Sequence, residues 1–427
     1  AGNMTSVKDA ANNTTSYTYN TFGQATSVTT PDNKTTSYAY DTKGNLTSTT
    51  DSSGAVTQYQ YDTKGNVLNI TDAEGKTTTF TYDTYNNPVS ITDSTGATTT
   101  FTYDISGNTT SVTDSQGTTT RFEYNSQNQI VKVIDSSGNA TSSAYDAMGN
   151  RTSQTDANGN VTRYEYNYKG QITKVIDSLG GITTYEYGGT GCASCSGGTD
   201  KLTAITDAAG NRTTYEYDLL GRLIKETDSE GKIIVYSYDA SGNLISKTDS
   251  TGVAITYAYD SLKRLTAIQF PDSTQNISYT YDSTGKVFTM TNPSGTTAYS
   301  YDNSNRLLTD TKTIEGKTFN VSYSYTLVGA LTSIAYPSGR IVSYEYDPIG
   351  RIVKVIEEKD GKRQEIISSI AYNTNGSVAS INYANGIETT KGYDIKGMLN
   401  SLNIGNLKSL SYTRDNVGNI TAINDLL

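Results

Sequence analysis

Hydrophobic and aromatic residues alternate with polar ones along short segments of this chain. Leu68 and Ile70 share one side of an extended strand, with a polar residue between them, and Phe80 and Tyr82 do the same a few residues later. This period of two, together with enrichment in Thr, Tyr, Val and Ile, is typical of β-strands. No segment shows a helical period, so the pattern predicts an all-β protein.

The segments between the predicted strands share one turn pattern, Asp-x-x-Gly, as at 51–54 and 62–65. Asp favours the first position of a type I turn, and Gly favours a position where φ is positive or a bulge is needed. Each pair of neighbouring strands is therefore expected to form an antiparallel hairpin.

The strands and turns recur as a repeat of about 21 residues. The segment 40–45, Tyr-Asp-Thr-Lys-Gly-Asn, returns unchanged at 61–66. Alignment on the first residue gives nineteen copies, at Tyr19, Tyr40, Tyr61, Tyr82, Tyr103, Tyr124, Tyr145, Tyr166, Tyr187, Tyr217, Tyr238, Tyr259, Tyr281, Tyr301, Tyr325, Tyr346, Tyr372, Tyr393 and Tyr412. We therefore interpret residues 1–427 as a single array of about 19 repeats and as a fragment of a longer chain, with a Gly/Cys-rich insertion at 188–198.

Most copies carry a second aromatic residue two positions before the repeat tyrosine. Residues i and i+2 of a strand point to the same side, so stacked repeats are expected to build ladders of rings that supply the core. The residues predicted to form this structural ladder are Tyr40, Tyr61, Tyr82, Tyr103, Tyr166, Tyr187, Tyr217, Tyr238 and Tyr259.

Two strands in each repeat give about 38 strands of roughly five residues, far more than the about ten that an open sheet holds without curling. Each repeat alone would be marginal, but a stack of repeats is stable. The sequence therefore predicts a long, narrow ribbon that winds into a curved wall.

Composition excludes several classes of function. The chain has no His, so it lacks Ser-His-Asp and Cys-His nucleophiles and His-ligated metals. Its net charge of −10 is spread evenly and argues against nucleic acid as a partner. No apolar stretch reaches the length of a membrane span. Every repeat supplies an equivalent Asp, so no pair stands out as acid and nucleophile, and we predict no catalytic residue and no enzyme activity.

Three groups of residues are candidate ligand sites. Cys192 and Cys195 lie in the glycine-rich insertion without His or further Cys, which favours a local disulfide or inert thiols over a redox or intermolecular metal site. The turn aspartates occur singly, which favours turn capping over calcium binding. The aromatic pairs would suit stacking on sugars, but they are needed to build the core. We expect no metal and no cofactor.

Two segments carry a family resemblance. Residues 217–223, Tyr-Asp-Leu-Leu-Gly-Arg-Leu, and residues 346–352, Tyr-Asp-Pro-Ile-Gly-Arg-Ile, closely resemble the YD repeats of Rhs proteins. These repeats occur in Rhs polymorphic toxins, in the B and C components of insecticidal toxin complexes, in wall-associated proteins and in teneurins. The resemblance implies hairpins that spiral into a hollow shell, which encloses a C-terminal toxin domain in the toxin members and acts as an extracellular scaffold in the teneurins. The self-cleaving core segment of the toxins is not recognisable here, so no catalytic residue is carried over.

Two functions follow as expectations. The first is a non-catalytic segment of the encapsulating shell of a secreted Rhs-type toxin, whose partner is an enclosed C-terminal domain or another segment of the same parent protein. The alternative is an extracellular scaffold or adhesin without cargo, with self-assembly through the ribbon ends or glycan binding as variants. Both place the protein outside the cell or at the cell surface, a location that the family resemblance alone implies.

Overall fold

The computed structural model describes residues 2–8, 14–188 and 200–426. Within these ranges the chain forms 39 strands and one short 3₁₀ helix, η1 (Ser273–Gln275). The strands before the insertion are β1 (Ser6–Lys8), β2 (Thr14–Tyr19), β3 (Ala25–Thr29), β4 (Thr35–Tyr40), β5 (Leu46–Thr50), β6 (Val56–Tyr61), β7 (Val67–Thr71), β8 (Thr77–Tyr82), β9 (Pro88–Thr92), β10 (Thr98–Tyr103), β11 (Thr109–Thr113), β12 (Thr119–Tyr124), β13 (Ile130–Ile134), β14 (Ala140–Tyr145), β15 (Arg151–Thr155), β16 (Val161–Tyr166), β17 (Ile172–Ile176) and β18 (Ile182–Tyr187).

The strands after the insertion are more variable in length. They are β19 (Leu202–Thr206), β20 (Arg212–Tyr217), β21 (Leu223–Thr227), β22 (Ile233–Tyr238), β23 (Leu244–Thr248), β24 (Ala254–Tyr259), β25 (Leu265–Gln269), β26 (Ile277–Tyr281), β27 (Val287–Asn292), β28 (Gly295–Tyr301), β29 (Leu307–Ile314), β30 (Lys317–Tyr325), β31 (Leu331–Ala335), β32 (Ile341–Tyr346), β33 (Ile352–Lys359), β34 (Lys362–Tyr372), β35 (Val378–Tyr383), β36 (Glu388–Tyr393), β37 (Leu399–Ile404), β38 (Lys408–Arg414) and β39 (Ile420–Asp425).

All of these strands belong to one continuous antiparallel sheet. Each strand pairs with the strand before it and the strand after it in the sequence, as β6 does with β5 and β7. The sheet is therefore a meander, and its strands run across the width of a ribbon. The ribbon has two edges, each formed by the turns at alternate strand ends.

We name the two edges by the residue before the turn. The tyrosine edge carries the turns that follow the repeat tyrosine, such as 62–65, and the threonine edge carries the turns that follow the preceding strand, such as 51–54. In both turns the amide of Gly donates to the carbonyl of Asp, and Gly54 and Gly65 have φ of 87° and 92°. This is a type I turn closed by a residue in the left-handed region, a common hairpin connection.

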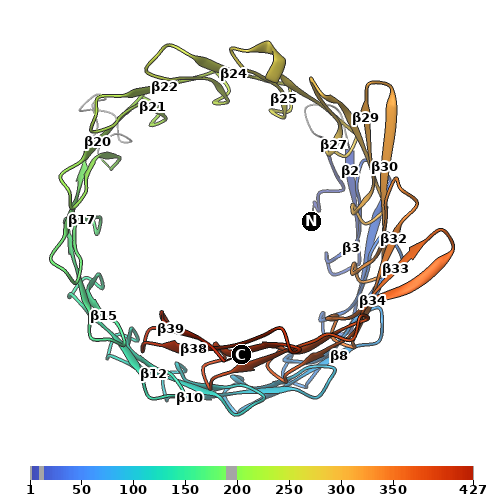
Figure 1. Ribbon diagram of the computed structural model, residues 1–427, viewed down its shortest axis with the longest axis horizontal. Coiled ribbons are helices and arrows are strands. Elements are labelled where there is room, and N and C mark those ends of the chain that lie inside the picture. Colours follow the sequence, from blue (N-terminus) through green and yellow to red (C-terminus); the bar gives the residue numbers. More distant parts are fainter. Residues whose placement is uncertain (1, 9–13, 189–199, 427) are drawn as a thin grey trace.

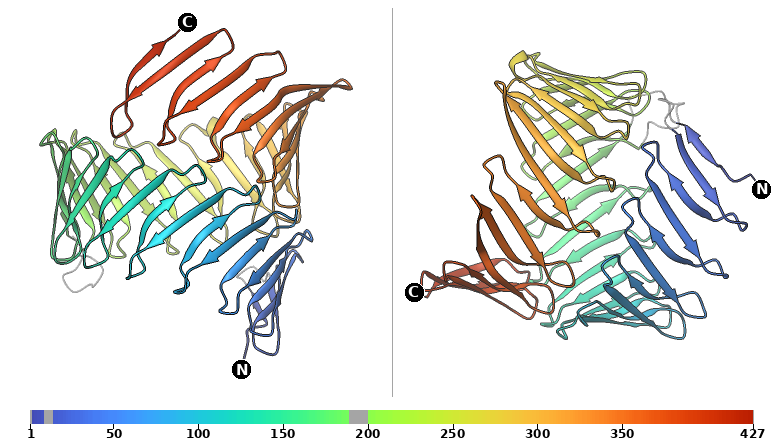
Figure 2. Two further views of the ribbon diagram at one scale, coloured as in Figure 1. Left: turned by 90° about the horizontal axis from the view of Figure 1, so that it is seen from below. Right: turned by 90° about the vertical axis from the view of Figure 1, so that its right-hand side faces the viewer.

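The ribbon winds into a ring around a lumen that no described strand crosses (Figure 1). The first repeats, coloured blue and cyan, lie beside the last repeats, coloured orange and red, whereas the green and olive part of the ring is a single winding (Figures 1 and 2). The prediction of an all-β ribbon of antiparallel hairpins that winds into a hollow wall is confirmed.

The wall differs from the expectation in lacking a conventional core. The buried residues in the described ranges are Ala204, Thr297, Val342, Ile356 and Thr389. A single sheet with no second layer leaves both faces partly open to solvent, so the ring ladders are half-buried. The ribbon is stabilised by contacts along the sheet rather than by packing between layers.

The last repeat departs from the sequence alignment. The bulge that lies directly before the repeat tyrosine in other copies lies here directly before Arg414, which pairs with Ile420. Tyr412 therefore occupies the place of the first aromatic residue of the pair, and Arg414 replaces the repeat tyrosine. The last repeat is therefore centred on Arg414, two residues later than the tyrosine pattern predicts.

Candidate functional site: the wall and its seam

The turn aspartates act as local caps. Asp62 Oδ1 accepts hydrogen bonds from the backbone amides of Lys64 and Asn66, both at 2.8 Å, and Oδ2 accepts one from Asn66 Nδ2 at 2.8 Å. In the preceding repeat, the hydrogen bonds that Asn45 donates lower the pKa of Asp41. An ionised carboxylate with several donors fixes the turn, since it satisfies amides that the sheet leaves unpaired.

The repeat tyrosines stabilise each hairpin at the end opposite its turn, where the last residue of one strand lies beside the first residue of the other. The hydroxyl of Tyr61 donates to the carbonyl of Leu46 at 2.8 Å, and Tyr82 donates to Val67 at 2.8 Å. Burial raises the pKa of both hydroxyls, which keeps them protonated as donors. The same bond is made by eight of the nine tyrosines singled out in the sequence, namely Tyr40, Tyr61, Tyr82, Tyr103, Tyr166, Tyr217, Tyr238 and Tyr259.

Tyr187 is half-buried like the others, but its hydroxyl makes no such bond within the described ranges. It precedes the glycine-rich insertion directly. Cys192 and Cys195 lie outside the residues that the structure describes, so the disulfide stays a prediction.

Arginine replaces the turn asparagine in several C-terminal repeats. Arg306 Nε donates to Asp302 Oδ2 at 2.6 Å, and an Nη atom donates to the carbonyl of Thr326 at 2.7 Å. Its guanidinium also lies 5.0 Å from the ring centre of Tyr325. Arg222, Arg264 and Arg351 make the same Asp and Tyr contacts. Each arginine thus ties one turn of the tyrosine edge to the next repeat.

We expect Arg306→Ala to lower the free energy of unfolding by about 2 kcal/mol, because it removes two hydrogen bonds and a cation–π contact. Arg306→Asn should cost only about 1 kcal/mol, since asparagine can keep the bond to Asp302 that Asn66 makes to Asp62. Urea unfolding followed by circular dichroism measures both values. Equal losses in the two variants would contradict the assigned role of the turn bond.

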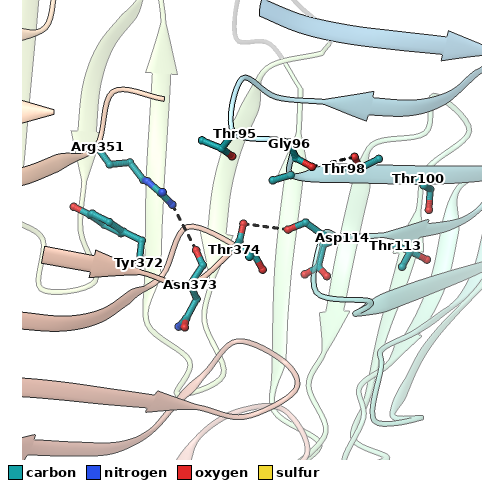
Figure 3. Close-up of a pocket in the computed structure, with 12 residues that line it drawn as sticks. Thr95, Gly96, Thr98, Thr100, Thr113, Asp114, Arg351, Tyr372, Asn373 and Thr374 are labelled. Carbon is teal, nitrogen blue, oxygen red and sulfur yellow. Dashed lines mark hydrogen bonds between the residues drawn. The ribbon is translucent and has the colours of Figure 1, made fainter. Parts of the chain in front are cut away.

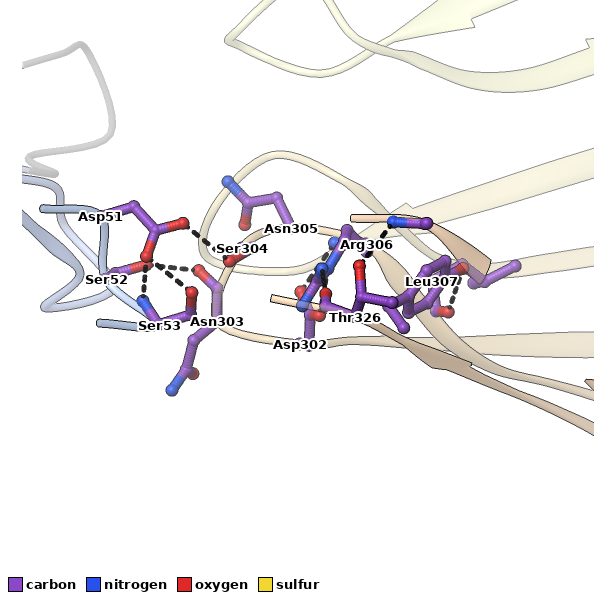
Figure 4. Close-up of polar contacts among 12 residues, drawn as sticks. Asp51, Ser52, Ser53, Asp302, Asn303, Ser304, Asn305, Arg306, Leu307 and Thr326 are labelled. Carbon is purple, nitrogen blue, oxygen red and sulfur yellow. Dashed lines mark hydrogen bonds and ion pairs between the residues drawn. The ribbon is translucent and has the colours of Figure 1, made fainter. Parts of the chain in front are cut away.

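The two windings meet along a seam. Turns of the threonine edge in the first winding face turns of the tyrosine edge in the second winding, and Figure 4 shows one such meeting, between 51–53 and 302–306. Here Ser52 Oγ donates to the carbonyl of Asn303 at 2.8 Å.

The seam contact repeats with a constant arrangement. A serine at the second position of the threonine-edge turn donates to the carbonyl at the second position of the tyrosine-edge turn, at 2.8–3.3 Å in four places: Ser52 to Asn303, Ser94 to Pro348, Ser115 to Thr374 and Ser136 to Ile395. Donor and acceptor are 251–259 residues apart. One winding thus holds about 23 strands, which at about 4.8 Å per strand gives a ring on the order of 35 Å across.

Alanine takes the place of serine at two turns of the same stretch. Ala73 makes no hydroxyl bond, and at Ala157 the neighbouring Asn158 donates instead to Asp415 Oδ2 at 3.2 Å. The side chain at the second turn position therefore decides whether the main seam bond forms.

One ion pair crosses the seam as well. Lys396 Nζ lies 2.9 Å from Asp135 Oδ2. Burial alone would raise the pKa of Asp135, but hydrogen bonds from Lys396 and Asn139 outweigh burial and hold this pKa below its ordinary value of 3.8. The ionised carboxylate therefore stabilises the closed seam.

We expect the seam to weaken in acid. A carboxyl group with a lowered pKa in the folded state contributes stability above its ordinary pKa, and this contribution is lost as the pH falls through the lowered value, here below 3.8. The pair is partly exposed, so the loss should be modest, about 0.5–1 kcal/mol. Spin labels at Gln116 and Asn375, on the two sides of the seam, should move apart between pH 5 and 3. A response of the same size in Lys396→Met would contradict this assignment.

A pocket of about 570 Å³ opens between two consecutive seam contacts (Figure 3). Its walls come from both windings, with Asp114 and Thr98 on one side and Arg351 and Tyr372 on the other. Arg351 is engaged with Asp347 and stacks on Tyr372, so the pocket is lined by groups that already have partners.

No cluster of three or more Cys, Asp or Glu side chains with metal-binding geometry occurs among the described residues. None of the helical segments in the described ranges has the length and apolarity that crossing a membrane requires.

Comparison with protein families gives two matches. The model described as Teneurin YD-shell matches residues 25–193 and 251–357, well over half of the chain. The chain belongs to the teneurin YD-shell family. The model described as RHS Repeat matches residues 1–35 and 198–233 of this YD-shell chain. No curated protein sequence matches it.

Solved structures share the fold of the YD-shell chain. The TcdB2–TccC3 complex without its hypervariable C-terminal region is 13% identical, with a TM-score of 0.59 over 96% of this chain and 32% of that one. The TcdB2–TccC3–TEV complex is also 13% identical, with a TM-score of 0.57 over 96% and 32%. The Photorhabdus luminescens Tc holotoxin pore is 17% identical, with a TM-score of 0.51 over 97% and 22%. The YD-shell chain thus spans about a third or less of the length of these structures.

Proposed function

We propose that this chain is a non-catalytic wall segment of a closed shell that encloses another part of its parent protein. The observation that carries the proposal is the seam, because serine, lysine and asparagine side chains join successive windings around a lumen that no described strand crosses. An extended ribbon that served only as a spacer would not need hydrogen bonds between one winding and the next, whereas a closed wall needs them. The similarity to shells in Tc toxin structures supports the same function.

The enclosed partner would be a C-terminal domain or another segment of the same polypeptide, and the whole protein would be exported or displayed at the cell surface. In this proposal residues 1–427 form one array of about 19 repeats within a longer protein. A ring on the order of 35 Å across leaves room for a chain segment or a small domain.

Limited proteolysis of the parent protein, read by intact-mass spectrometry, tests the proposal. A segment outside the repeats should stay protected while the wall is folded. Lys396→Glu places a second negative charge against Asp135 and should open the seam, so the protected segment should be cut sooner. Lys247→Glu makes the same charge change at an exposed position away from the seam and should leave protection unchanged.

An extracellular scaffold or adhesin without cargo is the second candidate. The ring is open at both ends in the described ranges (Figure 2), which suits a scaffold as well as an incomplete shell. Immediate digestion of every segment outside the repeats, while the repeats persist, would overturn the container and favour the scaffold.

A further inference from the structure

A lysine joins the two windings at a turn where the seam serine is replaced. At the threonine-edge turn before β4 the second position is Pro31, which has no hydroxyl to donate. Lys34, just after this turn, crosses to the second winding instead, and its Nζ donates to Asn305 Oδ1 at 2.7 Å. The carboxylate of Asp32, whose Oδ2 lies 2.9 Å from the same Nζ, holds the ammonium group in place. A charged donor from the first winding thus lies against the side-chain amide of Asn305.

A second lysine contacts the same amide oxygen. Lys286 follows the tyrosine-edge turn one repeat before Asn305, and its Nζ also donates to Asn305 Oδ1. This Nζ lies over the ring of Tyr301, 4.9 Å from the ring centre. Burial lowers the pKa of Lys286, and the positive charge of Lys34 lowers it further, against the opposing effect of three nearby aspartates. The neutral amine, which is the nucleophilic form, is therefore more populated than in an ordinary lysine.

Another turn of the same edge shows the corresponding bond with a donor that cannot react. Asn86 occupies the place of Asn305, with φ of 71° against 69°. Its Oδ1 accepts a hydrogen bond at 3.1 Å from Nδ2 of Asn66, which occupies the place of Lys286. An amide nitrogen is not a nucleophile, because its lone pair is delocalised into the carbonyl group. At Asn305 a lysine amine takes this place, and a second lysine reaches the oxygen from the other winding.

We propose that Lys286 and Asn305 form an isopeptide bond, a modification that ties two neighbouring turns of the tyrosine edge covalently. The neutral Nζ of Lys286 attacks Cγ of Asn305. The bond between Cγ and Nδ2 of Asn305 breaks, and Nδ2 leaves as ammonia with the proton that the attacking nitrogen gives up. An amine and an amide are consumed, and a substituted amide and ammonia are formed, so the step needs no oxidant and no further reactant.

Lys34 stabilises the charge that develops during this step. Negative charge gathers on Oδ1 of Asn305 when Cγ becomes tetrahedral, and the Lys34 ammonium already lies at that oxygen. Asn305 is exposed at the meeting of the windings that Figure 4 shows, so ammonia can leave to solvent. A cavity of about 220 Å³ borders Asn305 on the side of Asp32 and gives the leaving group room.

Tryptic peptide mapping of the parent protein by mass spectrometry tests the proposal. Trypsin cuts an unmodified chain after Arg264, Lys286 and Arg306, which gives the peptides 265–286 and 287–306. The isopeptide bond blocks cleavage at Lys286. The whole segment should therefore appear as one peptide, lighter than its sequence mass by one ammonia.

Three other results would overturn the proposal. The first is a pair of separate peptides of full mass. The second is conversion of Asn305 to aspartate, which would mean that water rather than Lys286 attacks the amide. The third is a bond from Lys34 to Asn305, which would join the peptide 287–306 to a peptide of the first winding instead.

Variants at the two bonded residues locate the bond. Lys286→Arg keeps the trypsin site and the positive charge, but its guanidinium stays protonated and should not react. Asn305→Gly removes the amide and places in this turn the residue that Gly65 supplies at the same position. Both variants should yield separate peptides of full mass. A missing cut after residue 286 in either variant would contradict the assigned bond.

Variants at Lys34 test its part in the reaction. Lys34→Met should slow the loss of ammonia by about 100-fold, the usual effect of removing a donor from a developing oxyanion. Lys34→Arg keeps a charged donor and should restore most of the rate. Intact-mass spectrometry at increasing times after synthesis measures both rates. An unchanged rate in Lys34→Met would overturn the role of Lys34.

Discussion

Gly295→Ala is expected to lower the free energy of unfolding by about 3–4 kcal/mol, because the new methyl group has no room. Gly295 opens β28 after a two-residue turn, with φ of 144°. A Cβ there would lie only 2.0 Å from the carbonyl oxygen of Thr313 on the neighbouring strand β29. The obstacle is backbone held in the sheet, so it cannot move aside as a flexible side chain would.

Gly54→Ala provides the matched control. Gly54 also has a positive φ, 87°, but nothing lies within 4 Å of a Cβ built there. Its substitution should cost only the backbone strain of alanine in the left-handed region, about 1 kcal/mol. Urea unfolding of both variants gives the comparison, and hydrogen exchange should locate the Gly295 effect in β27–β29. Equal losses in the two variants would show that the clash with Thr313 is relieved by local movement.

The local structure of the wall could be predicted from sequence because each repeat encodes it completely. The alternation at Leu68 and Ile70 fixes the strand β7, and Asp62 and Gly65 specify the turn before it through a cap and a positive φ. These signals act over a few residues and recur in almost every repeat. The winding of the ribbon could also be predicted from the sequence, since a meander of this length cannot stay flat.

The seam could not be predicted in the same way. It joins residues more than 250 positions apart, and its register depends on how many strands complete one turn. In the sequence, Ser52 and Ser115 resemble any other turn serine. Only the folded structure shows that they bond the second winding, whereas Ala73 and Ala157 at the same turn position cannot. The extent to which the ladder rings are buried could not be predicted either, because the sequence does not reveal that the sheet has no second layer.

The exchange of Asn for Arg at the end of the tyrosine-edge turn indicates a structural difference between repeats that the sequence analysis did not use. Asn66 and Arg306 occupy the same place and bind the corresponding Asp oxygen, and both reach the next turn, but only arginine also stacks on the tyrosine ring of the next repeat. A shift from Asn to Arg along a repeat array thus indicates where neighbouring turns are tied more firmly. In this chain the arginines lie in the repeats after the insertion, where hairpin lengths vary most.

Tyr82→Ala is expected to lower the free energy of unfolding by about 2–3 kcal/mol. The ring is half-buried in the ladder, and its hydroxyl bonds the carbonyl of Val67 at 2.8 Å. Loss of a fully buried aromatic ring costs about 3–5 kcal/mol, so partial exposure reduces the expected value. Tyr82→Phe keeps the ring and removes only the hydrogen bond, which should cost about 1 kcal/mol.

The position of the substituted repeat should decide how far along the sheet the loss of stability extends. Tyr82 has repeats on both sides, and the strand that pairs with it, β9, leads to the seam turn of Ser94, so its substitution should weaken a long stretch of sheet together. Tyr393, which makes the same bond to Val378, lies near the C-terminal end, where Tyr393→Ala should release mainly β36–β39. Repeat stability depends on nearest-neighbour contacts, so hydrogen exchange should show a wide effect for Tyr82 and a local one for Tyr393. A local effect at both sites would mean that the windings contribute little to the cooperativity of the wall, and that the seam closes the ring without strengthening it.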